Sequence, residues 1–81
     1  MRLEHTLQIR RALQKFPKNI RETFYKQVEF LKSDMRHPSL RAKKYDESAD
    51  IWQARVTGAV RFYFRIEGDT YRLLNIRKHP K

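Results

Sequence analysis

The spacing of apolar residues changes about halfway along this chain of 81 residues. In the first half apolar side chains recur every three or four residues, as on one face of a helix, and in the second half they alternate with polar ones, as in a strand. Each of these amphipathic elements must bury its apolar side against another element. The sequence therefore predicts an α+β domain in which helices pack on a sheet.

The first helix is predicted to begin after Thr6, a residue type that caps helix N-termini. Ile9, Ala12, Leu13 and Phe16 follow at the spacing of a single helical face. This segment is therefore expected to present one apolar stripe.

The second helix is predicted to start at Pro17, because a proline has no N–H to leave unpaired in a first turn. Pro38 limits it at the other end. The short joint at Pro17 predicts a helical hairpin. Its apolar stripe consists of Ile20, Phe24, Val28, Leu31 and Met35.

Three strands are predicted at residues 51–56, 60–66 and 72–77, with turns around Gly58 and Gly68. Alternation assigns their side chains to two faces. Arg72 falls on the apolar face, from where we expect it to reach solvent at the sheet margin. The face expected to lie under the helices consists of Trp52, Ala54, Val56, Val60, Phe62, Phe64, Ile66, Leu74 and Ile76.

Two segments complete the predicted architecture. Residues 39–45 are open to two interpretations, a short strand or an ordered loop, and residues 1–5 are expected to add an edge strand. The result is a single domain over residues 1–81 with the order β-α-α-β-β-β. In it, the helical hairpin covers one face of a small antiparallel meander.

The other face of the sheet is expected to stay open and to be cationic. Leu73 is the apolar residue assigned to it, and none of its residues is a carboxylate. Neighbouring cations repel across a sheet, and with a net charge of +10 the chain is suited to a polyanion such as the phosphates of RNA. Tyr63 could stack on an unpaired base. The polar residues expected on this open face are Gln53, Arg55, Arg61, Tyr63, Arg65, Asn75 and Arg77, with His79 and Lys81 at its end.

One residue of this face suits proton transfer. Histidine is the side chain best suited to give or take a proton near neutral pH, and His79 is the histidine of this face. Arg55 and Arg61 could stabilise the charge that develops on a phosphate under attack by a ribose 2′-hydroxyl. This chemistry needs no metal and cannot act on DNA, which lacks that hydroxyl.

Several other classes of protein are excluded or disfavoured. The chain has no cysteine for a disulfide or a thiolate zinc site, and His5, His37 and His79 match no metal-ligand spacing. Glycine-rich phosphate loops, apolar runs of membrane-spanning length and a signal peptide are also missing. We expect a cytoplasmic protein without metal or cofactor.

The chain resembles the RelE/ParE superfamily of toxins from type II toxin–antitoxin systems. The likeness covers nearly the whole length. It is carried by FPKNI at 16–20, HPSLR at 37–41, IWQARV at 51–56, VRFYFRI at 60–66 and IRKH at 76–79.

The resemblance implies a toxin that enters the ribosomal A site and cuts mRNA there, and an antitoxin that covers its basic face. Arg61 matches the arginine that holds the scissile phosphate, His79 the C-terminal histidine that acts as general acid, and Arg55 a position often taken by a catalytic lysine or arginine.

The chain departs from the family pattern at two places. Gln53 replaces a residue that is commonly basic, and Pro80 and Lys81 stand where a tyrosine often follows the terminal histidine. Lys81, Lys43 and Lys44 are the candidates to replace the missing group in proton transfer.

Two other functions remain open at this point. One is a toxin of the ParE type, which inhibits DNA gyrase through protein contacts and cleaves nothing. The other is an inactive toxin-like domain that binds its antitoxin and, as a complex, operator DNA.

Overall fold

Two helices and a five-stranded sheet make up residues 1–79, the part of the chain that the computed structural model describes. In chain order the elements are β1 (Arg2–His5), α1 (Leu7–Leu13), α2 (Lys18–Ser33), β2 (Lys43–Asp46), β3 (Ile51–Thr57), β4 (Val60–Glu67) and β5 (Thr70–Lys78). None of the helices in this range is long and apolar enough to span a membrane.

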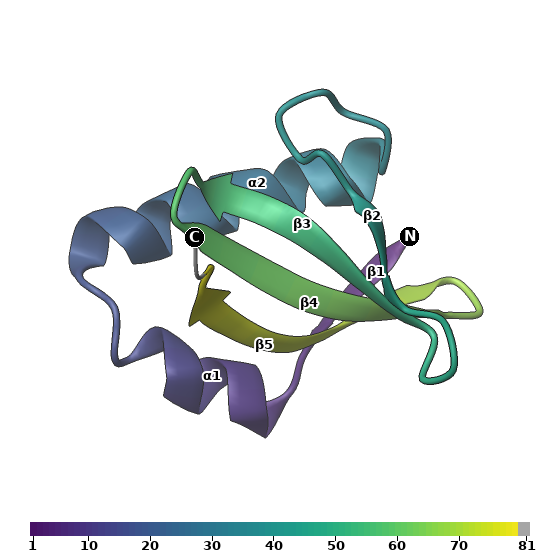
Figure 1. Cartoon of the computed structure of the whole chain (residues 1–81), viewed down its shortest axis with the longest axis horizontal. Helices are drawn as coiled ribbons and strands as arrows, with labels where there is room; N and C mark the ends of the chain where they lie inside the picture. The colour runs from purple at the N-terminus through teal and green to yellow at the C-terminus, as the bar shows by residue number, and fades with distance from the viewer. Residues whose placement is uncertain (80–81) are drawn as a thin grey trace.

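The strands lie in the order β1-β5-β4-β3-β2. Strands β2 to β5 form an antiparallel meander, and β1 pairs in parallel with β5 at one edge (Figure 1). The predicted α+β class and the edge strand are confirmed. Residues 43–45 of the segment left open belong to a strand, β2, so the sheet has one strand more than the predicted order. The parallel pairing of β1 with β5 makes the sheet mixed.

The helices cover the sheet at two different places. Helix α2 lies behind β3 and β4, and α1 lies along the outer side of β5 (Figure 1). Thr6 caps α1 as predicted: its Oγ1 accepts a hydrogen bond from the Ile9 N–H at 3.3 Å and donates one to the Leu73 carbonyl at 2.7 Å. The cap thus ties the start of α1 to β5.

Aromatic side chains fill the space between α2 and the sheet. Phe24 of α2 meets Phe62 of β4 edge to face, with ring centroids 5.4 Å apart, and Phe64 lies beside Phe62 at 5.9 Å. All three are fully buried. The apolar stripe predicted for the second helix therefore packs on the predicted apolar face of β4.

The face assignment predicted for the last strand is correct from Asn75 to Arg77 but wrong for residues 72–74, because β5 contains a β-bulge. Tyr63 pairs with Asn75, but Phe64 pairs with Leu73, so Leu74 is an extra residue between the two pairs. Leu73 is consequently fully buried and Leu74 is only half-buried. Compared with uninterrupted alternation, one inserted residue moves the side chains that precede it in the strand to the opposite face of the sheet.

Arg72 is displaced by the same shift. It was predicted on the apolar side, yet it lies opposite Arg65 on the open face. There it forms ion pairs with Glu4, at 3.5 Å, and with Glu67, at 3.7 Å. One end of the open face therefore carries carboxylates.

The turn between β4 and β5 depends on the left-handed backbone of Gly68, at φ +60°. We expect Gly68→Ala to lower the free energy of unfolding by about 1 kcal/mol, because a side chain is strained in that conformation. A Cβ there would meet no atom within 4 Å, so backbone strain is the whole effect. Urea unfolding measures it, with Gly58→Ala as the control at a turn whose φ is not left-handed. Equal stability of Gly68→Ala and wild type would contradict this assignment.

His5, the last residue of β1, is half-buried against α2, with its ring 6.4 Å from that of Phe24 and 6.2 Å from that of Tyr25. Burial first, and then the charge of Arg10, lower its pKa below 6.5. The folded state thus favours the neutral imidazole, and its stability should fall as the pH drops below about 6.5. We expect His5→Phe to weaken this loss, measured by urea unfolding at pH 7.5 and 5.5. An unchanged pH dependence in the variant would contradict the prediction.

Candidate nucleic-acid interface

Three arginines lie side by side across the open face of the sheet. Arg55 of β3 pairs with Arg61 of β4, and Arg61 pairs with Arg77 of β5. Neighbouring strands are about 5 Å apart, so the Cα atoms of the three arginines stand in a line roughly 10 Å long. We call these residues the arginine row. Its members were all predicted on this face, and the register brings them together.

The guanidinium of Arg61 is held against the β3–β4 turn. Its Nη1 donates to the carbonyls of Thr57 at 2.6 Å, Val60 at 3.2 Å and Gly58 at 3.3 Å. Within residues 1–79 its Nε and Nη2 have no hydrogen-bond partner, so they can donate to an incoming anion. The guanidinium of Arg55 lies near the same turn: its Nη2 would be 3.4 Å from a Cβ placed on Gly58.

His79 is anchored at this turn as well. Its backbone N–H donates to the Ala59 carbonyl at 2.7 Å, while the residue itself is exposed. With Tyr45, Tyr63, Arg77 and Lys78 it lines a hollow of about 450 Å³. The three residues predicted to be catalytic, Arg55, Arg61 and His79, are therefore gathered around one end of the sheet.

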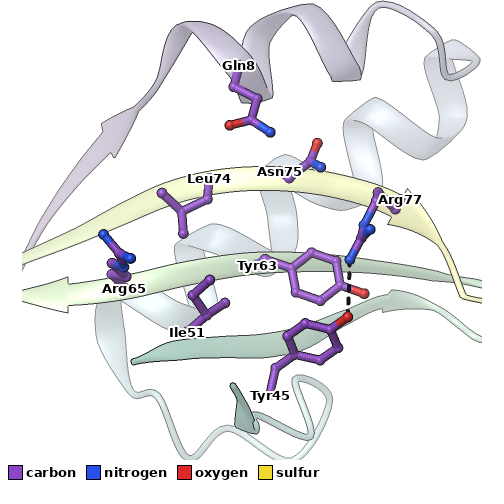
Figure 2. Close-up of a pocket in the computed structure, with 8 residues that line it drawn as sticks. All are labelled: Gln8, Tyr45, Ile51, Tyr63, Arg65, Leu74, Asn75 and Arg77. Carbon is purple, nitrogen blue, oxygen red and sulfur yellow. Dashed lines mark hydrogen bonds between the residues drawn. The ribbon is translucent and has the colours of Figure 1, made fainter. Parts of the chain in front are cut away.

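Arg77, the end member of the arginine row, lies against Tyr45 and Tyr63 (Figure 2). We call these three residues the tyrosine ridge. The Arg77 guanidinium lies 4.7 Å above the Tyr63 ring and donates to the Tyr45 hydroxyl at 3.4 Å, and the two rings meet edge to face at 4.9 Å. The bond to Tyr45 is the main cause that raises the pKa of Arg77. Tyr63 is only 6% exposed beneath its neighbours, and Tyr45 is 52% exposed.

Tyr45 is the aromatic residue of this face that the sequence did not single out. It belongs to β2, which pairs with β3 with an irregularity between Lys44 and Asp46. The sequence offered only one strand-favouring aromatic residue in a segment of four residues, Lys43–Asp46. A segment this short does not fix which strand is its partner.

The remaining predicted contacts are spread over the same face. Gln53 is 6% exposed, between its partners Lys43 and Tyr63. Arg65 donates from Nε to the Ala49 carbonyl at 3.0 Å, which holds it at the β2–β3 turn. Lys43 is exposed at the β2 edge.

Of the two other predicted lysines, Lys44 and Lys81, only Lys44 is among the described residues. Lys44 sits opposite Trp52 on the helix side of the sheet, where its Nζ lies 4.8 Å from the Trp52 ring centroid and bonds to Asp50. That bond raises the pKa of Lys44. The structure thus places Lys44 away from the arginine row. Lys81 lies outside the described residues.

Charge is unevenly distributed over the open face. The prediction that no carboxylate lies on it is wrong at the end where Glu4 and Glu67 pair with Arg72. Arg61 and Glu67 are six residues apart on β4, or roughly 20 Å. The arginine row therefore lies at the end of the face that is distant from this ion-paired cluster. Within residues 1–79, no group of His, Asp and Glu side chains could hold a metal ion.

Comparison with solved structures identifies the fold. The YoeB/ParE toxin from Agrobacterium tumefaciens superimposes with a TM-score of 0.79 at 19% identity, covering 99% of this chain and 100% of the toxin. For a chain of the archaeal RelE–RelB complex from Pyrococcus horikoshii, the TM-score is 0.78 at 20% identity, and the match covers 95% of this chain and 92% of that one. For a chain of the RelB–RelE antitoxin–toxin complex from Methanococcus jannaschii, the TM-score is 0.77 at 18% identity, and the match covers 93% of this chain and 88% of that one.

Sequence comparison alone does not reach these proteins: no protein-family model and no curated protein matches the chain. The structural match nevertheless extends over nearly all of it. The resemblance to the RelE/ParE superfamily is thereby confirmed for the fold, and the chain has the architecture of the RelE and YoeB toxins.

Proposed function

We propose that this protein is the toxin of a type II toxin–antitoxin system, and that it cleaves mRNA in the A site of cytoplasmic ribosomes. The observation that carries the proposal is the arginine row next to His79, on an uncovered sheet face of a toxin-like fold. Cations in this arrangement repel one another, and an RNA phosphate bound across them would relieve that repulsion.

The proposed reaction is an attack by the ribose 2′-oxygen on the adjacent phosphorus. The 2′-oxygen–phosphorus bond forms, the hydroxyl proton leaves to water, and the bond from phosphorus to the 5′-oxygen breaks. Arg61 and Arg55 stabilise the negative charge that develops on the phosphorane. His79, as imidazolium, protonates the departing 5′-oxygen. The products are a 2′,3′-cyclic phosphate and a 5′-hydroxyl.

An antitoxin is the proposed protein partner. Toxins of this fold have been solved together with RelB in archaea and with YefM in Staphylococcus aureus. For this chain we propose a partner that covers the cationic face, because its charge of +10 favours an acidic segment there.

Binding of single-stranded RNA should depend on salt through the arginine row. If its three arginines each neutralise one phosphate, the affinity should fall about 20-fold between 50 and 200 mM salt. Fluorescence anisotropy with a short labelled RNA measures this slope. Arg77→Gln should make the slope shallower by about 0.7, whereas Arg72→Gln should not change it. A flat response in the wild type would contradict a phosphate-binding row.

Expression of the toxin without antitoxin tests the proposed target. Growth should stop with mRNA cut inside codons, while plasmid supercoiling by gyrase stays normal. His79→Ala should restore growth at equal protein level. Loss of supercoiling with intact mRNA would instead indicate a gyrase inhibitor, and harmless expression of the wild type would indicate an inactive binding domain.

A further inference from the structure

The β-bulge in β5 places an apolar side chain on the cationic face. Leu74 turns away from the core and, with Ile51 of β3, lines a hollow of about 310 Å³ (Figure 2). Bulges often re-aim a side chain next to a functional site. Leu74 is half-buried, so part of its apolar surface is open to a ligand in this hollow.

The rim of this hollow is polar and rich in donors. The Asn75 Oδ1 accepts the Ile76 N–H at 2.9 Å, which leaves Nδ2 as a donor. Gln8 of α1 lies above Asn75 and points toward it (Figure 2). Arg65 lines the opposite end, with Nε bound to Ala49 and its Nη groups remaining as donors. Such donors match the carbonyl and ring-nitrogen acceptors of a nucleobase.

The hollow adjoins the arginine row through the tyrosine ridge. Tyr45, Tyr63 and Arg77 line both this hollow and the one that contains His79. Tyr45, with its ring half exposed, offers a surface for stacking at the boundary. An RNA strand with a phosphate on the arginine row can therefore direct one base into the hollow on the other side of the tyrosine ridge.

We propose that this hollow is a subsite for one unstacked nucleobase of the bound RNA, with Leu74 and Ile51 as its floor and Gln8 and Asn75 as its polar rim. The inference rests on the proposed function, since it requires RNA on the arginine row. A flat cationic face would hold the strand by its phosphates alone. The subsite binds one base in addition to the phosphates, so the residues of the hollow determine which bases are preferred.

The test compares two ligands with the same phosphates. Hexauridylate carries bases, and a fully abasic ribose-phosphate hexamer does not. The wild type should bind hexauridylate about tenfold more tightly than the abasic hexamer at equal salt. Leu74→Asn should remove most of this preference and leave the affinity for the abasic hexamer unchanged. Leu7→Asn, at an apolar residue that is 62% exposed on α1 and does not line this hollow, is the matched control.

A second variant guards against misfolding of the bulge. Gln8 is exposed on α1, so Gln8→Ala should leave the sheet intact and lower hexauridylate affinity about threefold. Equal wild-type affinity for the two hexamers would overturn the subsite and leave RNA binding in place. Retention of the full preference by Leu74→Asn and Gln8→Ala would also overturn it. Binding of neither hexamer would overturn the proposed function together with the subsite.

Discussion

Arg61→Ala is expected to slow the proposed cleavage of ribosome-bound mRNA by about 100- to 1,000-fold. The guanidinium is held by three turn carbonyls, so its position is set before the substrate arrives. Removal of one preorganised donor to a developing negative charge typically costs that factor. Single-turnover cleavage of an mRNA paused with an empty A site measures it.

Arg72→Ala provides the matched control. Arg72 lies on the same face and in the strand next to that of Arg61, but its charge is paired with Glu4 and Glu67. Its loss should change the cleavage rate little, because the arginine row is untouched. Equal rate losses for the two variants would mean that overall charge, and not the row, drives the reaction. Circular dichroism verifies that both variants fold.

The second large effect concerns stability and comes from the β-bulge. Leu73→Ala should lower the free energy of unfolding by about 2–5 kcal/mol, because the side chain is fully buried in the core. That is a large part of the roughly 5–15 kcal/mol available to a small domain. Leu74→Ala should cost less than about 1 kcal/mol, since its side chain lines an open hollow.

Urea unfolding of both leucine variants distinguishes the two possible registers. Uninterrupted alternation along β5 would give the reverse order, with Leu74→Ala the more damaging. That result would contradict the bulge, and it would remove the apolar floor from the proposed base subsite.

The helices and the side-chain faces of β3 and β4 could be predicted from the sequence because their patterns are local. The stripe from Ile20 to Leu31 and the alternation from Val60 to Phe64 each repeat several times within one element. The bulge could not be predicted, because Leu73 and Leu74 are equally apolar and adjacent. Which of them enters the core is decided by pairing with Phe64.

The candidate site was predictable to the extent that it follows from strand register. Alternation placed Arg55, Arg61 and Arg77 on one face, and the antiparallel meander aligned them. Tyr45 and Gln8 reach the site from β2 and α1, whose positions depend on tertiary packing. Glu4 was missed for the same reason: it meets Arg72 only because β1 pairs in parallel with β5.

The most direct test of the proposed reaction removes a single oxygen atom, the attacking 2′-oxygen, from the substrate. An mRNA with one 2′-deoxynucleotide at the A-site cleavage position keeps its phosphate but lacks the nucleophile. We predict that the purified protein cuts the all-ribose mRNA on the ribosome, leaves a 2′,3′-cyclic phosphate and a 5′-hydroxyl, and does not cut at the deoxy position. Cleavage of the deoxy-substituted mRNA at an undiminished rate, or no cleavage of the all-ribose mRNA, would contradict the mechanism.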